Sequence, residues 1–268
     1  DDGTEVKITN VSLSNINFEG TLTFASGLII NTGTLTNCNT IENIIIGDNV
    51  TIRADNFSKC NNLKTVTIGR NVKMPNDQWS LYYFKECNSL ETVTVESISE
   101  IGYSAFKSVG AALKGDIVIN EGVTRICGEG VFSGCSSITS VSFPSTLTEI
   151  GSSAFKNCTS LKTAKLPDGI KTIGERAFEN CSSLEDEVVI EEGVTVGRWA
   201  FGGKCGIKKL IVKNNAIIYS YAFQECYNLS NVEIKDNVTI RADNFSKCNN
   251  LKTVTIGKNV KMPNDQWS

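Results

Sequence analysis

The stretch "LTEIGSSAFKNCTSLKTAKLPD", residues 147–168, contains each part of a unit that recurs along this chain. An Ala-Phe pair ending at Phe155 is followed by Cys158, and then by Ala164 and Leu166. These last two residues alternate with polar ones, which is the pattern of a half-buried strand. The Pro-Asp pair that closes the stretch is typical of a turn. Because one such unit cannot bury its own apolar side, we expect each unit to stack on its neighbours.

The phenylalanine of this unit recurs at intervals of 22 to 27 residues, and Leu35 takes the same place 22 residues before the first one. A fixed period of this length indicates a solenoid. About ten coils, each advancing by one strand spacing of about 4.8 Å, predict a column on the order of 50 Å long. The phenylalanines are predicted to form its internal spine, at Phe57, Phe84, Phe106, Phe132, Phe155, Phe178, Phe201, Phe223 and Phe245.

The chain also contains a second, much longer repeat. Residues 48–80 return as residues 236–268 with one change, from Arg70 to Lys258, and the offset of 188 residues equals eight short units. Solvent-facing positions match as well as core positions do, although core packing would not require that. A recent block duplication explains the match, and the duplication by itself does not mark a binding site.

The repeated pattern, C-x-x-L-x-x-I-x-L-P-x-x-[LI]-x-x-I-G-x-x-A-F-x-x-C, resembles the BspA-like leucine-rich repeat family over residues 26–268. The resemblance implies a right-handed, mainly β superhelix of 22–27-residue coils with short helical or irregular turns. Residues 1–25 are expected to form an N-terminal β cap or a diverged first coil. The sequence departs from the pattern at Val109, which replaces a cysteine, and between Phe201 and Cys205, where one residue is added.

The same resemblance implies a surface or secreted protein of a host-associated microbe, because family members are mostly of that kind and some take part in adhesion. The partner would be an unidentified host protein or glycan. The expected localisation is therefore extracellular or at the cell surface.

Composition indicates neither a nucleic-acid partner nor membrane insertion of this fragment. The chain has 26 basic and 29 acidic residues, a net charge of −3, and no apolar run approaches a membrane-spanning length. The densest basic cluster has no accompanying aromatic stripe and is interpreted as a solvated face. It comprises Lys204, Lys208, Lys209 and Lys213.

The two ends suggest a portion of a longer protein. The chain begins with Asp1 and shows no leader sequence, and Ser268 falls where the first copy of the duplication continues. We therefore expect the natural protein to continue past Ser268. An uncapped last coil would also permit end-to-end or edge contacts there.

Nine of the ten cysteines follow the repeat, and Cys127 lies outside the phase. The favoured interpretation is a column of small buried thiols, since free cysteine is among the most buried residue types. One or two disulfides between coils are the alternative. No metal site is predicted, because the chain has no C-x-x-C pair and no histidine.

The sequence predicts no enzyme and no cofactor. The absence of histidine removes the usual base for nucleophilic catalysis. The repeated carboxylates occupy equivalent turn positions, which turn formation explains, and one carboxylate per coil is too sparse to predict a calcium site. These carboxylates are Asp48, Glu121, Asp168, Glu192 and Asp236.

A variable position before each Ala-Phe pair provides the best candidate binding site. If the register holds, Arg176, Trp199 and Tyr221 lie on three consecutive coils, and an arginine beside two aromatics is typical of an interface hot spot. The alternative is that these aromatic side chains only cover the edges of their coils. The candidate set is Arg176, Trp199, Tyr221 and Tyr219, with Tyr82 and with Trp79 from a loop insertion.

Together these features predict a non-catalytic binding module, with adhesion to host protein or glycan through one solenoid face. A passive spacer that projects another domain is the alternative. The polar strand face, rich in Thr, Ser, Lys and Glu, suits either function.

Overall fold

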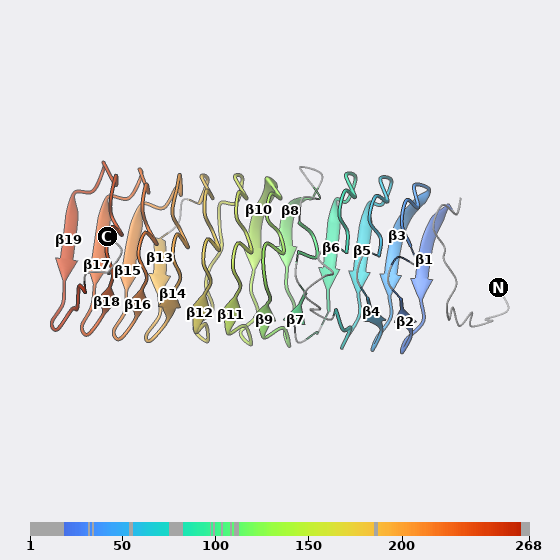
Figure 1. Ribbon diagram of the computed structural model, residues 1–268, viewed down its shortest axis with the longest axis horizontal. Coiled ribbons are helices and arrows are strands. Elements are labelled where there is room, and N and C mark those ends of the chain that lie inside the picture. The colour runs from blue at the N-terminus through green and yellow to red at the C-terminus, as the bar shows by residue number, and fades with distance from the viewer. Residues whose placement is uncertain are drawn as a thin grey trace.

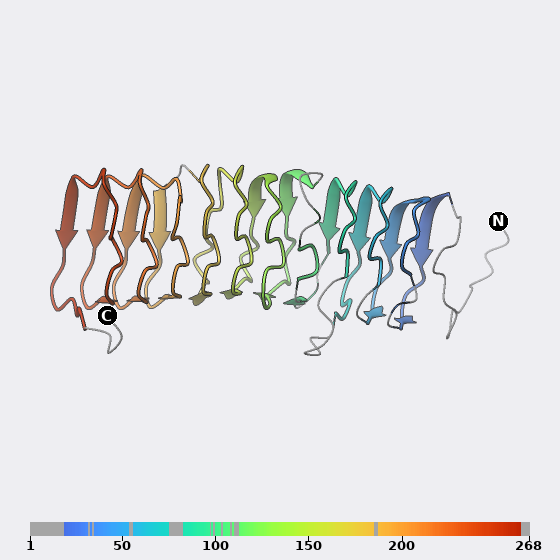
Figure 2. The same ribbon diagram turned by 45° about the horizontal axis from the view of Figure 1, so that its top comes forward.

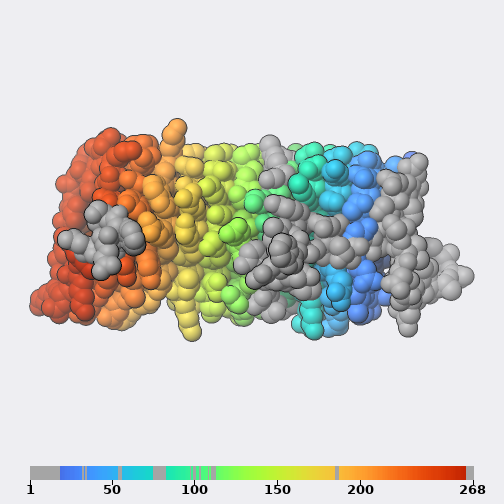
Figure 3. Space-filling view, in the orientation of Figure 1, coloured from blue at the N-terminus to red at the C-terminus, as the bar shows by residue number. Residues whose placement is uncertain are grey.

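The computed structural model describes residues 19–31, 33, 35–53, 56–74, 83–96, 98, 100–102, 104–107, 109, 113–184 and 187–263. These residues form an elongated column of about ten stacked coils that follow one another in chain order (Figures 1 and 3). Most coils contain a longer strand, a turn, a two-residue strand and an irregular return. No helix occurs within the described ranges, so the returns take the irregular form of the two that the resemblance implied. The predicted solenoid is confirmed.

The longer strands lie side by side along one face of the column (Figure 2). All their pairings are parallel, as expected when each coil returns to the same side. They form three ladders, in the orders β1-β3-β5-β6, β10-β8 and β13-β15-β17-β19. Their bounds are β1 Gly20–Phe24, β3 Ile41–Ile46, β5 Thr65–Ile68, β6 Thr92–Val95, β8 Lys114–Val118, β10 Ser137–Ser142, β13 Glu187–Ile190, β15 Lys209–Val212, β17 Asn231–Ile234 and β19 Thr253–Ile256.

The two-residue strands follow a second edge of the column, and seven of them form one continuous sheet in the order β18-β16-β14-β12-β11-β9-β7. The other two, β2 and β4, pair with each other near the N-terminal end. Their bounds are β2 Ile29–Ile30, β4 Thr51–Ile52, β7 Glu100–Ile101, β9 Arg125–Ile126, β11 Glu149–Ile150, β12 Thr172–Ile173, β14 Thr195–Val196, β16 Ile217–Ile218 and β18 Thr239–Ile240.

The predicted two-residue alternation is confirmed in the longer strands. In β15 and β17 the second and fourth residues are buried, while the first and third are exposed or partly exposed. Val188 pairs with Leu210, and Leu210 with Val232, so identical positions of successive coils meet. One residue of slip would turn these side chains to the solvent, which is why the pattern specifies the register.

The phenylalanine spine is also confirmed. The rings of Phe57 and Phe84 stack with centroids 5.1 Å apart, and the same stacking continues coil by coil to Phe223 and Phe245, at 6.3 Å. Leu35 is buried at the head of the column. The spacing of the rings is that of offset aromatic pairs, which stabilise beyond their buried area.

All ten cysteines are buried and none forms a disulfide, which is the favoured of the two interpretations. Several of the thiols donate a hydrogen bond to the phenylalanine carbonyl of the preceding coil, as Cys158 does to Phe132 at 3.2 Å and Cys181 to Phe155 at 3.2 Å. Burial raises the pKa of Cys158 to about 12, because the thiolate would lose its hydration. Burial raises the pKa of Cys135 and Cys181 in the same way, so the thiols in the middle of the column stay protonated.

The N-terminal region is described only in part. Residues 1–18 lie outside the described ranges, and β1 pairs with β3 as the first rung of its ladder. The division at residue 25 remains a prediction.

Candidate functional site

The three candidate residues on consecutive coils occupy one backbone position that recurs along the column. Arg176, Trp199 and Tyr221 all have positive φ, at 57°, 58° and 64°. The Arg176 N–H donates to the Arg198 carbonyl at 2.9 Å, which joins this slot to the next coil. The predicted register of the three residues is therefore correct. The left-handed region disfavours bulky side chains, and so these three residues are held there by the fold.

Two of the three candidate side chains form one stacked pair. The Trp199 and Tyr221 rings lie 5.1 Å apart with an angle of 16° between their planes. The guanidinium carbon of Arg198 lies over the Tyr221 ring at 5.5 Å. Such a cation over an aromatic face contributes roughly 0.5–1 kcal/mol at an exposed site.

A second cation–aromatic pair joins the coil of Tyr221 to the next coil. The Tyr219 side chain is 37% exposed, and the guanidinium carbon of Arg241 lies 4.8 Å from its ring centroid. Ser220, between the two tyrosines, is buried. Tyr219 and Tyr221 therefore both face away from the core. We call the five residues of these contacts the aromatic patch: Arg198, Trp199, Tyr219, Tyr221 and Arg241.

The indole of Trp199 lies close against the coil backbone at Gly202. A Cβ added to Gly202 would lie 2.8 Å from Cε3 of Trp199, closer than real contacts allow. In the coils on either side this position carries Glu179 and Gln224. The glycine thus provides the room in which Trp199 lies flat and meets Tyr221.

The structure separates Arg176 from this cluster. Its guanidinium forms ion pairs with Glu175 at 3.3 Å and with Glu179 at 3.7 Å. The cation that reaches the rings is Arg198, one position before Trp199. Tyr82 and Trp79, the other two candidates, lie outside the described residues.

Sequence reasoning did not select Arg198 or Arg241. Arg241 follows β18 as Tyr219 follows β16, so the repeat alignment alone places these two side chains on neighbouring coils. The repeat alignment could therefore have predicted the contact between Arg241 and Tyr219. The position of Arg198 over a ring of the next coil had no such signal, because it depends on the side-chain conformation.

The basic cluster behaves as a solvated face with partners. Lys209 forms an ion pair with Glu187, and Lys213 with Glu191 at 2.5 Å, in each case across neighbouring coils. Exposed pairs of this kind stabilise little, by about 0–1 kcal/mol each. The paired glutamates neutralise the charges of Lys209 and Lys213, which an anionic ligand would otherwise meet.

A family model matches most of the chain. The model of the BspA type leucine rich repeat region matches residues 7–112, 114–217 and 187–266. The chain belongs to the BspA type leucine rich repeat family. The resemblance drawn from the repeated pattern is thereby confirmed.

Solved structures of similar fold were also found for this BspA type chain. A T. pallidum leucine rich repeat protein is 22% identical, with a TM-score of 0.44, over 78% of this chain and 77% of that one. A leucine rich cell surface protein from Faecalibacterium prausnitzii is 19% identical, with a TM-score of 0.39, over 91% and 84%. A leucine-rich repeat protein from Bacteroides ovatus is 20% identical, with a TM-score of 0.35, over 92% and 84%. A comparison with curated protein sequences found no match.

Over the described ranges, no group of three or more Cys, Asp or Glu side chains could hold a metal ion. Nor does that part of this BspA type chain contain a helix with the length and apolar character that a bilayer crossing requires.

Proposed function

We propose that this BspA type solenoid is a non-catalytic binding module whose aromatic patch contacts a protein or glycan partner. The observation that carries the proposal is the stacked pair of Trp199 and Tyr221 with Arg198 over its outer ring. Tryptophan, tyrosine and arginine dominate interface hot spots, because they bury large area and still offer polar contacts. Aromatic faces also suit the apolar faces of sugar rings.

The choice of residues at the stripe supports a role beyond packing. Serine, glycine or aspartate fills the same positive-φ slot in other coils, at Ser153, Gly130 and Asp243. Trp199 and Tyr221 occupy it at a strain of about 1 kcal/mol or more each. A coil edge could be covered without that cost, and a contact surface gives a reason for it.

The wider biological role forms part of the proposal. We place the module at the cell surface or outside the cell, where it would adhere to a host protein or glycan. Membership of the BspA type family favours this over a catalytic role. A passive spacer that projects another domain is the second candidate, favoured by the elongated column itself.

The test is a binding screen of the 268-residue chain against arrayed matrix proteins and glycans, with a matched double variant beside it. Trp199→Asn with Tyr221→Asn removes both rings, and asparagine tolerates the left-handed region, so little strain is added. Ser153→Asn with Asp243→Asn makes the same substitution in this slot of other coils and serves as the control.

We expect a saturable partner whose affinity falls at least tenfold in the Asn double variant and stays unchanged in the control. An affinity unchanged in both variants would place the contact elsewhere on the solenoid. A blank array for the folded chain would favour the spacer.

A further inference from the structure

The long-strand face is interrupted in the middle of the column. Between most neighbouring coils, the N–H after a long strand donates to the last carbonyl of the preceding strand, as Lys213 does to Ile190 at 2.9 Å. Pro167 takes this place after Leu166 and has no N–H to donate to the coil before it. On the other side of this segment, among the described residues, the N–H of Glu191 after β13 makes no such bond to the Leu166 carbonyl. The segment 164–166 forms no strand. Within the described part of the chain, β13 pairs with β15 alone.

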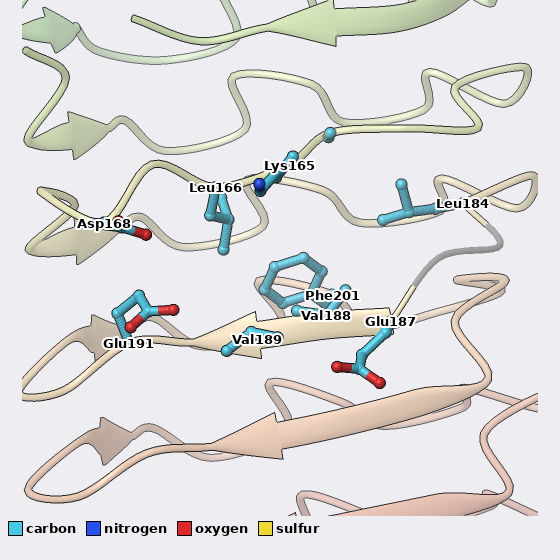
Figure 4. A pocket seen from close by; sticks show the side chains of 10 residues that line it. Lys165, Leu166, Asp168, Leu184, Glu187, Val188, Val189, Glu191 and Phe201 are labelled. Atoms are coloured by element: carbon cyan, nitrogen blue, oxygen red, sulfur yellow. The ribbon is translucent and has the colours of Figure 1, made fainter. Parts of the chain in front are cut away.

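A hollow of about 370 Å³ lies at this interruption, between the segment 164–166 and β13. Figure 4 shows Leu166 on one wall, Val188 on the other and Phe201 between them. Ala164 stands in a slot that Val141, Val188, Leu210 and Val232 fill with larger buried side chains in nearby coils. Its short side chain is therefore one cause of the hollow.

The rim of the hollow is acidic. Asp168, Glu187 and Glu191 line it together with Lys165. Glu187 and Glu191 are paired to Lys209 and Lys213 of the next coil, away from the open edge. Asp168 makes no hydrogen bond or ion pair within the described residues. Its charge acts on Lys213 without a direct ion pair, so the Asp168 carboxylate lies beside an open strand edge and can still accept a hydrogen bond.

We infer that this interruption is a docking site for an extended peptide that carries an aliphatic side chain next to lysine or arginine. The peptide pairs with the free edge of β13 as an added parallel strand. Its aliphatic side chain enters the space above Phe201 that Ala164 leaves, and its cation meets Asp168. Strand addition of this kind takes affinity from backbone hydrogen bonds and specificity from alternate side chains.

The other edge of β13 shows what such a strand looks like. There β15 places Leu210 beside Val188, and Lys213 beside Glu191. The hollow is near the lower end of ligand pockets, about 300–1,000 Å³. It suits one anchor side chain, and the peptide backbone then remains along the open edge.

The probe is the labelled peptide Lys-Lys-Leu-Ile-Val-Lys-Asn, which has the sequence of residues 208–214, capped at both ends. Fluorescence anisotropy with the full chain is expected to show saturable binding that weakens with added salt. In its own coil Val212 faces the following strand, where its carbonyl accepts from Lys235, so in the docked peptide its N–H faces β13. The same peptide with Val212→Pro loses this backbone donor and is expected to bind at least tenfold more weakly.

Two variants of the chain locate the site. Ala164→Leu fills the hollow with the side chain that Leu210 carries in this slot, and should abolish binding without unfolding the chain. Asp168→Asn keeps the shape and removes the charge, and should weaken binding several-fold with a smaller salt dependence. Val254→Leu makes a comparable change at the exposed end of the column and should leave binding unchanged.

Hydrogen exchange provides a second measurement. Amides of β13 should exchange faster than those of β17, which has partners on both sides, and should slow when the peptide is added. The inference is overturned if the peptide shows no saturable binding up to about 1 mM. Equal binding to the Ala164→Leu variant overturns it too, as does equal exchange in β13 and β17. The aromatic patch plays no part in these outcomes, so either proposal can fail alone.

Discussion

Val66 and Val254 occupy the same position of two nearly identical 33-residue stretches, yet Val66 is 1% exposed and Val254 is 45% exposed. The next strand, β6, covers Val66 by pairing it with Val93. Val254 lies on β19, which ends its ladder in the described structure. One sequence therefore has two packing environments, and the chain contains its own matched control.

Val66→Ala should lower the free energy of unfolding by about 1–3 kcal/mol, because buried methyl groups are lost and a cavity is left. Val254→Ala should change it by less than about 0.5 kcal/mol. Chemical denaturation of both variants checks this. Equal costs would show that the terminal coil is covered in solution, as the predicted end-to-end contacts would do.

The thiol column predicts very low reactivity of the native chain. Burial raises the pKa of Cys181 as well as that of Cys158, and the thiolate is the reactive form. A disulfide-exchange reagent at pH 8 should label at most Cys248 before unfolding, because its contact with Cys226 lowers the pKa of that thiol, and all ten cysteines in denaturant. Fewer than ten in denaturant without reductant would instead support the disulfide alternative.

Glu121 predicts a dependence of stability on acid pH. The backbone N–H of Ser145 donates to its Oε1 at 2.9 Å and the Ser145 hydroxyl to its Oε2 at 3.0 Å. The backbone bond is the main cause of a lowered pKa for this carboxyl. A lowered pKa stabilises the fold above the unfolded value, about 4.3, and the effect is lost as pH falls through the folded value.

Glu121→Gln should therefore reduce stability at pH 7, with a difference from the parent chain that shrinks toward pH 3. Urea denaturation across this range measures it. Ser145→Ala keeps the backbone donor and should retain most of the pH dependence. A difference that stays constant with pH would contradict the assignment.

Gly202→Ala should displace the Trp199 indole, because the new Cβ has only 2.8 Å to Cε3. Either the ring leaves Tyr221 or the chain accepts an overpacking cost of about 1–3 kcal/mol. Fluorescence of Trp199, in a background with Trp79→Phe and Trp267→Phe, should shift toward that of a more exposed indole. An unchanged spectrum with unchanged stability would show that the ring does not lie against Gly202.

Much of the fold was predictable because the period repeats the same constraint many times. The interval between phenylalanines such as Phe155 and Phe178 specifies which residues share a slot, and neighbouring slots then lie one strand spacing apart. The register of Arg176, Trp199 and Tyr221 followed from this, as did the buried column of thiols. Each depends on backbone position alone.

The tertiary structure determined which contacts the side chains at these positions make. Arg176 turns to Glu175 and Glu179, while Arg198 reaches Tyr221. The hollow at Ala164 also depends on the coils around it, because a short side chain leaves space only where the neighbouring strand does not close over it. The repeat period determines which positions are neighbours. The conformations of two adjacent coils together determine which atoms meet.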